Sequence, residues 1–219
     1  MPLTPHQRDL ALRAAEVIRI KGLQARTREI AEAIGVSEAW LFRHFKNKEE
    51  IFAALRSLHE EKVIAFVDGF CAAEPSAWRA LAGLSALIDH IVVQPRRDPV
   101  LAGRFAELHG TDAAAEHLRA LMDDVLGRFI AAWSDSYALA EAEGWFLNAL
   151  GSTAELLWAA HHLLLGTSVF HNSRLASATE DAERSLVERT FWTVMQLLGA
   201  TERGRAAANS FLAQGATHG

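Results

Sequence analysis

Residues 27–45 read TREIAEAIGVSEAWLFRHF, and this stretch decides how the first part of the chain folds. Gly35 can adopt the left-handed backbone conformation that ends a helix. The hydroxyl of Ser37 can then cap a second helix by accepting a backbone N–H. The sequence therefore predicts a helix-turn-helix, in which Val36 fills the space between two short helices. The buried side of the first of these helices is expected to consist of Ile30, Ala31 and Ile34.

The second short helix, over residues 38–45, has two unlike sides. At about 100° per residue, Leu41 and Phe45 fall together on the buried side. The opposite side, which we expect to face outward, consists of Ala39 and Arg43 flanked by Trp40 and Phe42. Its small residue lets the helix approach a major groove, its arginine can reach guanine or phosphate, and its rings can touch thymine methyls or sugars.

Three of these side chains also have a structural interpretation. Tryptophan is often largely buried, so Trp40 can pack the head together instead of reading DNA. His44 lies half inward and can contact the first helix of the chain. Arg43 can be a solvated surface charge.

The rest of the chain also has helical spacing and predicts an all-α fold. Helices are expected at 5–22, 27–34, 38–45, 47–73, 76–93, 99–108, 111–133, 138–167 and 180–199. The prolines of QPRRDP (94–99) are expected to break the chain between helices, and Gly144 to weaken one. The predicted domains are residues 1–50, residues 51–200 and a frayed or loosely docked tail, 201–219. The expected inner stripes are Leu10, Leu12, Ala15 and Ile18 in the first helix, and Ile51, Leu55, Leu58 and Phe66 in the fourth.

The charge of this 219-residue chain is unevenly distributed. Residues 1–56 hold ten Lys and Arg against seven Asp and Glu, whereas the remainder is net acidic, and the whole chain carries −5. A basic head on an acidic body indicates that the head meets a polyanion. A single cysteine excludes an internal disulfide framework. Without a long apolar stretch or a signal-peptide core, we expect a cytoplasmic protein with no membrane contact.

The run REIAEAIGVSEAWLFRHFKNKEEIFAAL resembles the DNA-binding head of the tetracycline-repressor-like (TetR) family of bacterial transcription regulators. The matching pieces are IAEAIGVS, then Leu41 to Phe45, then KNKEE before the long fourth helix. The resemblance covers about residues 8–56. It departs from the family at Trp40, where a small polar residue is more usual, and at Arg26, where a Ser or Thr often caps the helix.

The resemblance implies a set of DNA-contacting residues. The aromatic ring of Phe42 is expected against a backbone phosphate, and Lys48 is expected to hold another at the start of the fourth helix. Thr27 is the alternative cap in place of Arg26. With the outward face and the motif KNKEE included, the predicted contacts to double-stranded DNA are Thr27, Arg28, Ser37, Ala39, Trp40, Phe42, Arg43, His44, Lys46 and Lys48.

The second half of the chain contains a heptad-like seam. In the helix expected at 138–167, apolar residues recur from Leu147 through Leu150 to Leu164 at steps of three and four. With the last helix, this spacing favours a four-helix dimer interface, the alternative being a buried helix of a monomer. The interface is expected to comprise Ala154, Leu157, His161, Leu164, Leu186, Thr190, Val194 and Leu197. A homodimer also suits a palindromic DNA site, since one short helix reads too few base pairs.

The aromatic residues of the second half can line a pocket for an unidentified small-molecule effector, although core packing is their alternative. The predicted ligand site comprises Phe105, His109, Phe129, Trp133, Trp158 and His162. The histidines lack the spacing that places two metal ligands on one helical face, so we expect no metal and no cofactor.

Three functions fit these observations. The first is a homodimeric regulator, a repressor released from a palindromic operator by a small molecule. The second is a DNA-binding protein without an effector, acting in chromosome organisation. The third, an all-α enzyme, is disfavoured because the sequence has no nucleophile motif, phosphate-binding loop or metal-binding spacing.

Overall fold

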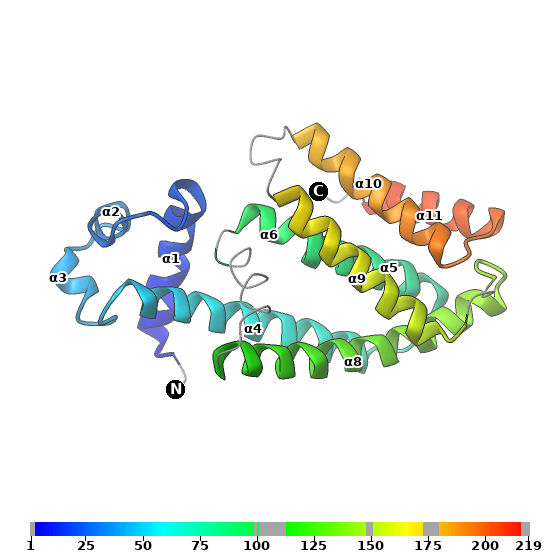
Figure 1. The fold of residues 1–219 in the computed structure, drawn as a ribbon, viewed down its shortest axis with the longest axis horizontal. Helices are drawn as coiled ribbons and strands as arrows, with labels where there is room; N and C mark the ends of the chain where they lie inside the picture. The colour runs from blue at the N-terminus through cyan, green and yellow to red at the C-terminus, as the bar shows by residue number, and fades with distance from the viewer. Residues whose placement is uncertain (1–2, 99, 101–112, 148–150, 173–179, 216–219) are drawn as a thin grey trace. The chain divides into compact units, whose positions relative to one another are not determined.

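The computed structural model describes residues 3–98, 100, 113–147, 151–172 and 180–215 (Figure 1). Within these ranges the chain forms helices joined by short connections, with an isolated β-bridge between Phe146 and Ala200. The predicted all-α fold is confirmed. The predicted helix at 99–108 lies almost wholly outside the described residues. The chain forms two compact units, residues 1–66 with 94–119 and residues 67–93 with 120–219.

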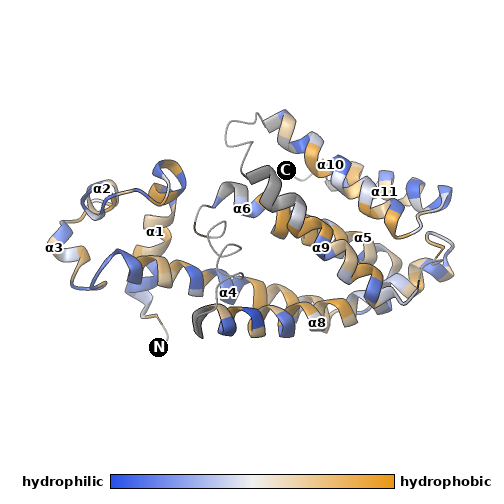
Figure 2. Cartoon of the chain, viewed as in Figure 1, coloured by the Kyte–Doolittle hydropathy of each residue, from blue (hydrophilic) through white to orange (hydrophobic). Residues whose placement is uncertain are grey.

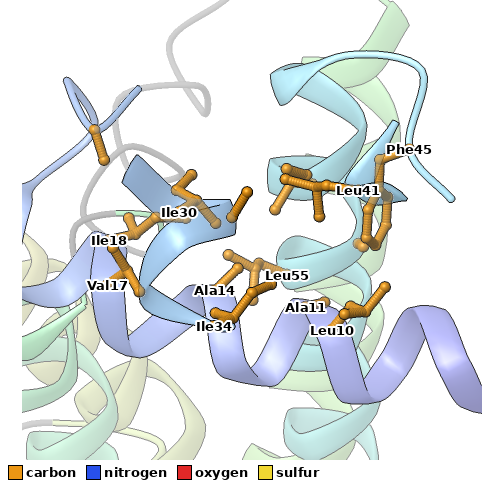
Figure 3. Close-up of a cluster of buried hydrophobic side chains, with 14 of the residues drawn as sticks. Leu10, Ala11, Ala14, Val17, Ile18, Ile30, Ile34, Leu41, Phe45 and Leu55 are labelled. Atoms are coloured by element: carbon orange, nitrogen blue, oxygen red, sulfur yellow. The ribbon is translucent and has the colours of Figure 1, made fainter. Parts of the chain in front are cut away.

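The head of the first unit consists of α1 (Pro5–Lys21), α2 (Thr27–Ala33), α3 (Glu38–Leu41) and the first part of α4 (Lys48–Ala72). Figure 3 shows the apolar side chains of these helices converging on one core. Burying such side chains contributes about 1.5–3 kcal/mol each, which holds together helices too short to persist alone. The most deeply buried members are Leu10, Ala11, Ala14, Ile18, Ile30, Ala31, Leu41, Phe45 and Ile51.

The turn between α2 and α3 has the predicted geometry. Gly35 has φ +77°, and its N–H donates to the Glu32 carbonyl at 3.1 Å. The Val36 N–H donates to the Ala31 carbonyl at 2.9 Å. This pair of bonds is a Schellman motif, which satisfies carbonyls at the end of α2 and turns the chain into α3. The partly buried Val36 packs against the head core, as predicted.

Two predicted stripes are only partly right. In α1, Leu10 and Ile18 are buried as predicted, but Leu12 is 47% exposed, and Ala11, Ala14 and Val17 complete the buried side. In α4, Phe66 is 47% exposed and Val67 is buried. Both errors displace the stripe by about one residue, which is a rotation of about 100° on a helix.

The second unit is built around an aromatic core on α8 (Ala113–Ala142). The Trp133 and Tyr137 rings lie 4.9 Å apart, and Tyr137 stacks on Phe146 at 4.7 Å. The Trp133 indole N–H donates to the Ala80 carbonyl at 2.8 Å, and the Tyr137 hydroxyl donates to the Leu198 carbonyl at 2.7 Å. The polar atoms of both rings are therefore satisfied inside the core, as buried aromatic residues require.

Four further helices pack in this unit: α5 (Ala77–Ile88), α9 (Thr153–Asn172), α10 (Glu180–Leu197) and α11 (Glu202–Gly215). α10 and α11 both pack against α5, and α9 packs against α10 and against the residues that follow α5. The colouring of Figure 2 is hydrophobic along much of α5 and α9. Within the described ranges, no helix combines the length and the apolar character that crossing a membrane requires.

The predicted break at QPRRDP begins too early. After α5 the backbone widens into a π-helix, η1 (Asp89–Val93), and then continues as α6 (Gln94–Arg97), which contains Pro95. A proline inside a helix removes one hydrogen bond and crowds the carbonyl four residues before it. The π-helix directly before Pro95 is where the backbone adjusts.

The predicted helices at 111–133 and 138–167 are wrong. α8 continues to Ala142 and ends in a Schellman motif in which Gly144 has φ +75°. The N–H groups of Gly144 and Trp145 donate to the carbonyls of Glu141 and Ala140, each at 2.8 Å. Gly144 is therefore a helix stop and not a weak point within a helix. Leu147 lies in the connection to α9, and Leu150 falls outside the described residues.

Within the predicted tail, Glu202–Gly215 form the helix α11. The corner before α11 is tied to the connection after α8, because the Leu147 N–H donates to the Gly199 carbonyl at 2.9 Å. The Thr201 N–H donates to the Trp145 carbonyl at 3.0 Å. A Cβ atom on Gly204 would lie 2.0 Å from that same Trp145 carbonyl oxygen, so only glycine fits at this crossing.

We predict opposite effects of alanine at two helical glycines. Gly204→Ala should lower the free energy of unfolding by about 1–3 kcal/mol, because backbone must move to admit the methyl group. Gly127→Ala should raise it by about 0.5–1 kcal/mol, because alanine favours a helix and Gly127 has open space around it. Urea unfolding monitored by circular dichroism measures both. Equal free energies of unfolding for the two variants would contradict the close approach of Gly204 to the Trp145 carbonyl.

Candidate nucleic-acid interface

The candidate recognition helix α3 is shorter than predicted. The Ser37 hydroxyl accepts the Trp40 N–H at 3.1 Å and caps the helix, as expected. After Leu41 the chain continues in tighter turns, in which the N–H groups of Arg43 and His44 donate to carbonyls three residues earlier at 3.1 and 3.0 Å. The sequence predicted helix to residue 45, but a single α-helical turn followed by tight turns carries the same side chains.

The orientation of this segment matches the prediction. Leu41 is fully buried, Phe45 is 2% exposed, and Ala39 and Arg43 are exposed on the other side. The Phe42 ring is 41% exposed. Two buried anchors four residues apart therefore turn a small residue, an aromatic ring and a guanidinium toward solvent. DNA contact by these side chains stays a prediction.

Arg43 differs from its neighbouring cations. The Arg28 guanidinium is 2.8 Å from the Glu32 carboxylate, and Lys46 lies 3.6 Å from Glu50. In the part of the chain that the structure describes, the Arg43 side chain has neither a hydrogen bond nor an ion pair. A guanidinium without an internal partner can engage an external acceptor without first breaking a contact.

Thr27 links the two helices of the motif. It is the first residue of α2, and its hydroxyl donates to the Glu38 carboxylate at 2.5 Å. Thr27 is therefore not the helix cap that was the predicted alternative. Arg26 occupies the cap position, where its N–H donates to the Glu29 carboxylate at 2.9 Å. Sequence reasoning overlooked Glu38, which fixes α3 against the start of α2.

Trp40 is partly buried and contacts rings from two segments. Its ring centroid lies 5.0 Å from that of His6 on α1 and 4.6 Å from that of His44. His6 and His44 are 4.7 Å apart, so the three rings form one cluster. In addition, the Gln7 side-chain amide donates to the His44 carbonyl at 2.9 Å. Both interpretations of Trp40 thus have a basis, because the ring packs against α1 while remaining partly accessible.

Lys48 begins α4 but is engaged inside the head. Its ammonium donates to the Leu23 carbonyl at 2.6 Å and lies 5.3 Å from the centroid of the Phe52 ring. Asn47 caps this helix, accepting the Glu50 N–H at 2.9 Å. An ammonium has three donors, so Lys48 retains hydrogens for a phosphate. The helix N-terminus itself has one N–H group fewer to offer than predicted.

The predicted ligand site stays a prediction, and those of its residues that the structure describes lie on α8 and α9. Phe105 and His109 lie outside the described residues. Phe129 is 3% exposed and Trp133 fully buried, so these two belong to the core of the second unit. Trp158 and His162 lie on α9 with ring centroids 5.9 Å apart, and the His162 ring is exposed. No group of three or more metal-binding side chains occurs among the described residues.

The predicted dimer residues lie mostly inside their own unit. Buried members are Leu157, His161 and Leu164 on α9 and Leu186 and Val194 on α10. Thr190 and Leu197 are half-buried, and Ala154 is exposed. A partner cannot contact the buried residues without unpacking the unit. These five residues therefore belong to the core of the unit and not to an exposed interface. The exposed side of α9 instead presents Ala159, His162, Leu163 and Gly166.

His161 is an unusual core residue. Its side chain is 7% exposed, and its Nδ1 atom is buried without a hydrogen-bond partner in the described structure. Burial, followed by the nearby His162 and His90, lowers the pKa of His161 to about 4. The imidazole is therefore neutral at pH 7, with one polar atom unsatisfied in an apolar setting.

Residues 12–55 match the sequence model of the family described as bacterial regulatory proteins, tetR family. Over 130 residues the chain is 30% identical to the nucleoid occlusion factor SlmA of two Aliivibrio fischeri strains, a match that covers 58% of this chain. The chain spans 64% of the length of these curated relatives.

Two solved structures have a similar fold. The ketosteroid transcriptional regulator KstR2 of Mycobacterium tuberculosis has a TM-score of 0.58 at 16% identity, covering 91% of this chain and 98% of that one. AibR, solved in complex with isovaleryl coenzyme A and operator DNA, has a TM-score of 0.54 at 17% identity, covering 89% and 99%. At these identities the likeness shows the fold alone.

We predict that His161 makes the protein less stable in mild acid. Below the unfolded pKa of 6.5 the unfolded chain binds a proton that the native chain excludes until about pH 4, so stability falls across that window. Between pH 7 and pH 5 this loss should amount to about 2 kcal/mol. His161→Leu should reduce the difference between urea unfolding at the two pH values by that amount. The exposed His117, changed to Leu, is the control, and an undiminished acid effect in His161→Leu would refute the assignment.

Proposed function

We propose that this chain is a DNA-binding transcriptional regulator of the tetR family of bacterial regulatory proteins, whose sequence model matches residues 12–55. It acts as a homodimer in the cytoplasm, represses from a palindromic operator, and is released by a small molecule. It has no catalytic role.

The observation that carries the proposal is the outward side of α3. Leu41 and Phe45 anchor the segment, while Arg43 extends from it with no partner among the described residues. The exposed Ala39 removes bulk where the helix must enter a groove. A small residue, an arginine unpaired in the described chain and an aromatic ring on one side of a helix suit contact with base edges. On a surface that faces only water, a small neighbour and an aromatic flank would have no such use for the arginine.

Dimerisation follows from the small size of the reading element. A helix of four residues contacts too few base pairs for useful discrimination, and two heads about 34 Å apart double the number. The exposed side of α9 supports a self-contact, because it combines small residues with Leu163, 47% exposed. Small side chains allow helices to pack closely, and a two-fold axis places the same face on both chains.

An effector site is supported by the unsatisfied His161 Nδ1 on α9. That helix packs against the π-helix η1, and π-helical segments are frequent at functional sites. A ligand with an apolar body and one hydrogen-bonding group would satisfy the imidazole and would bind one arrangement of these helices better than another. Such a ligand would cause release from DNA if the arrangement of helices that it prefers differs from the one that binds DNA.

A second candidate is an effector-independent DNA-binding protein. It is favoured by the 30% identity to proteins named nucleoid occlusion factor SlmA. Chromatin immunoprecipitation of the chain in its own cells distinguishes the two functions. A regulator should occupy one or a few promoters and leave them on addition of its effector, whereas a chromosome-associated factor should occupy many sites outside promoters.

We predict that Arg43→Ala weakens site discrimination. The ratio of affinities for the operator and for a scrambled duplex should fall about tenfold or more, because a bidentate contact to guanine contributes about 1–3 kcal/mol per head. Fluorescence anisotropy with DNA flanking the protein's own gene, across a salt series, measures the ratio. The residual binding should remain salt-dependent, because phosphate contacts are independent of sequence.

The control for that prediction is Arg19→Ala, which removes the same charge from α1. The Arg19 guanidinium pairs with Glu16 and lies on a different helix of the head. Its loss should leave the operator-to-scrambled ratio unchanged. If the two variants behave alike, Arg43 contributes only charge, and the outward side of α3 does not read bases.

We predict that Leu163→Glu converts the dimer to a monomer. Two buried, like-charged carboxylates on a two-fold axis are strongly unfavourable, so the dissociation constant should rise at least about a hundredfold. Sedimentation velocity of the full chain measures the change. Leu147→Glu is the control, since Leu147 is 69% exposed and lies outside α9 and α10. A dimer that survives Leu163→Glu would place the interface elsewhere.

A further inference from the structure

The start of α1 is joined by aromatic contacts to residues 38–45, the proposed DNA-reading segment. The His6 ring lies 5.0 Å from Trp40 with an interplanar angle of 78° and 4.7 Å from His44 with an angle of 64°. Both are edge-to-face arrangements, the geometry in which ring pairs attract through their charge distributions. His6 therefore contacts two residues of the predicted reading face, although it was not itself predicted to take part.

The position of His6 is fixed by the cap of α1. The Thr4 hydroxyl accepts the Gln7 N–H at 3.2 Å, while the Gln7 side-chain oxygen accepts the Thr4 N–H at 3.0 Å. The same Gln7 amide donates to the His44 carbonyl at 2.9 Å. This reciprocal capping box rigidifies the first turn of α1 and ties it to the end of the reading segment.

The reading segment needs such external support. α3 has one helical turn, and a helix of that length does not hold its own geometry in water. Leu41 and Phe45 fix its inner side, but they do not determine where the flanking ring of Trp40 points. Within the described part of the chain, the indole packs against the head core on one side, and the His6 and His44 rings contact it on the other.

We propose that His6 is a positioning residue of the DNA-reading face, which holds the Trp40 indole and the His44 imidazole in their binding orientation before DNA arrives. The proposal rests on the function proposed above. A ring that is already ordered does not lose rotamer freedom on binding, so it contributes more of its contact energy to affinity. His6 acts through Trp40 and His44, and need not touch DNA itself.

A positioning role differs from a stabilising one in what it changes. His6 is exposed, so its removal deletes little buried surface and should leave the thermal midpoint of unfolding almost unchanged. It should, however, release the Trp40 ring. His6→Phe retains an aromatic edge at the same place, and it should therefore preserve the orientation of the indole.

The test compares His6→Ala and His6→Phe in the full chain. His6→Ala should weaken operator binding about fivefold, the amount expected from the loss of aromatic pairs, with scrambled DNA bound as before. His6→Phe should restore the operator affinity. The resonance of the Trp40 indole N–H, assigned by its disappearance in Trp40→Phe, should shift in His6→Ala and return toward its original position in His6→Phe.

The two readouts separate failure of this proposal from failure of the proposed function. An unshifted indole resonance in His6→Ala, or unchanged operator affinity despite a shift, would overturn the positioning role. If the wild-type chain shows no preference for any operator, the regulator function fails, whereas the indole resonance still reports whether His6 holds Trp40. A loss of thermal stability equal in both variants would show that His6 is structural only.

Discussion

The burial of Leu41 and Phe45 is the constraint on which the rest of the head depends. The reading segment consists of one helical turn and two tight turns, so its direction is determined by what it buries and not by its own hydrogen bonds. Once these two side chains enter the core shared with α1, α2 and α4, Arg43 on the opposite side of the segment must face solvent. The outward orientation of Arg43 and Ala39 is a consequence of that packing, and an isolated peptide would not hold it.

Sequence reasoning succeeded where one residue determined local geometry. Gly35 ended α2 with a positive φ, and Ser37 capped α3, because each depends on the backbone of its immediate neighbours. The same reasoning failed at Gly144, where the apolar spacing continues without interruption from α8 into the following connection. A period of three and four residues records which face is apolar. This spacing contains no signal that the chain reverses. From the sequence, Gly144 is equally compatible with the interior of a helix and with the Schellman motif that ends α8.

The stripe of α9 that packs within the chain and the ring cluster of His6, Trp40 and His44 could not be specified from the sequence for a different reason, since both depend on residues distant in sequence. α9 is apolar on more than one side, so the pattern could not say which stripe packs within the chain; Leu157 and Leu164 proved to be core residues. Likewise, no spacing rule relates His6 to Trp40 thirty-four residues later. The one available signal was the capping box of Thr4 and Gln7, which fixes the first turn of α1 and therefore the place of His6.

The head also shows why net charge is a poor guide to DNA contact. Residues 1–56 carry an excess of three positive charges, yet Arg8, Arg13, Arg19, Lys21, Arg28 and Lys46 all lie within 4 Å of a carboxylate. Such exposed pairs contribute little to stability, but they reduce the field that each cation presents to a phosphate backbone. Arg43 is the exception on the face that the two buried anchors turn outward. In the proposed regulator, selectivity depends on the Arg43 guanidinium, which has no partner in the described chain, and the diffuse charge of the head only brings DNA near it.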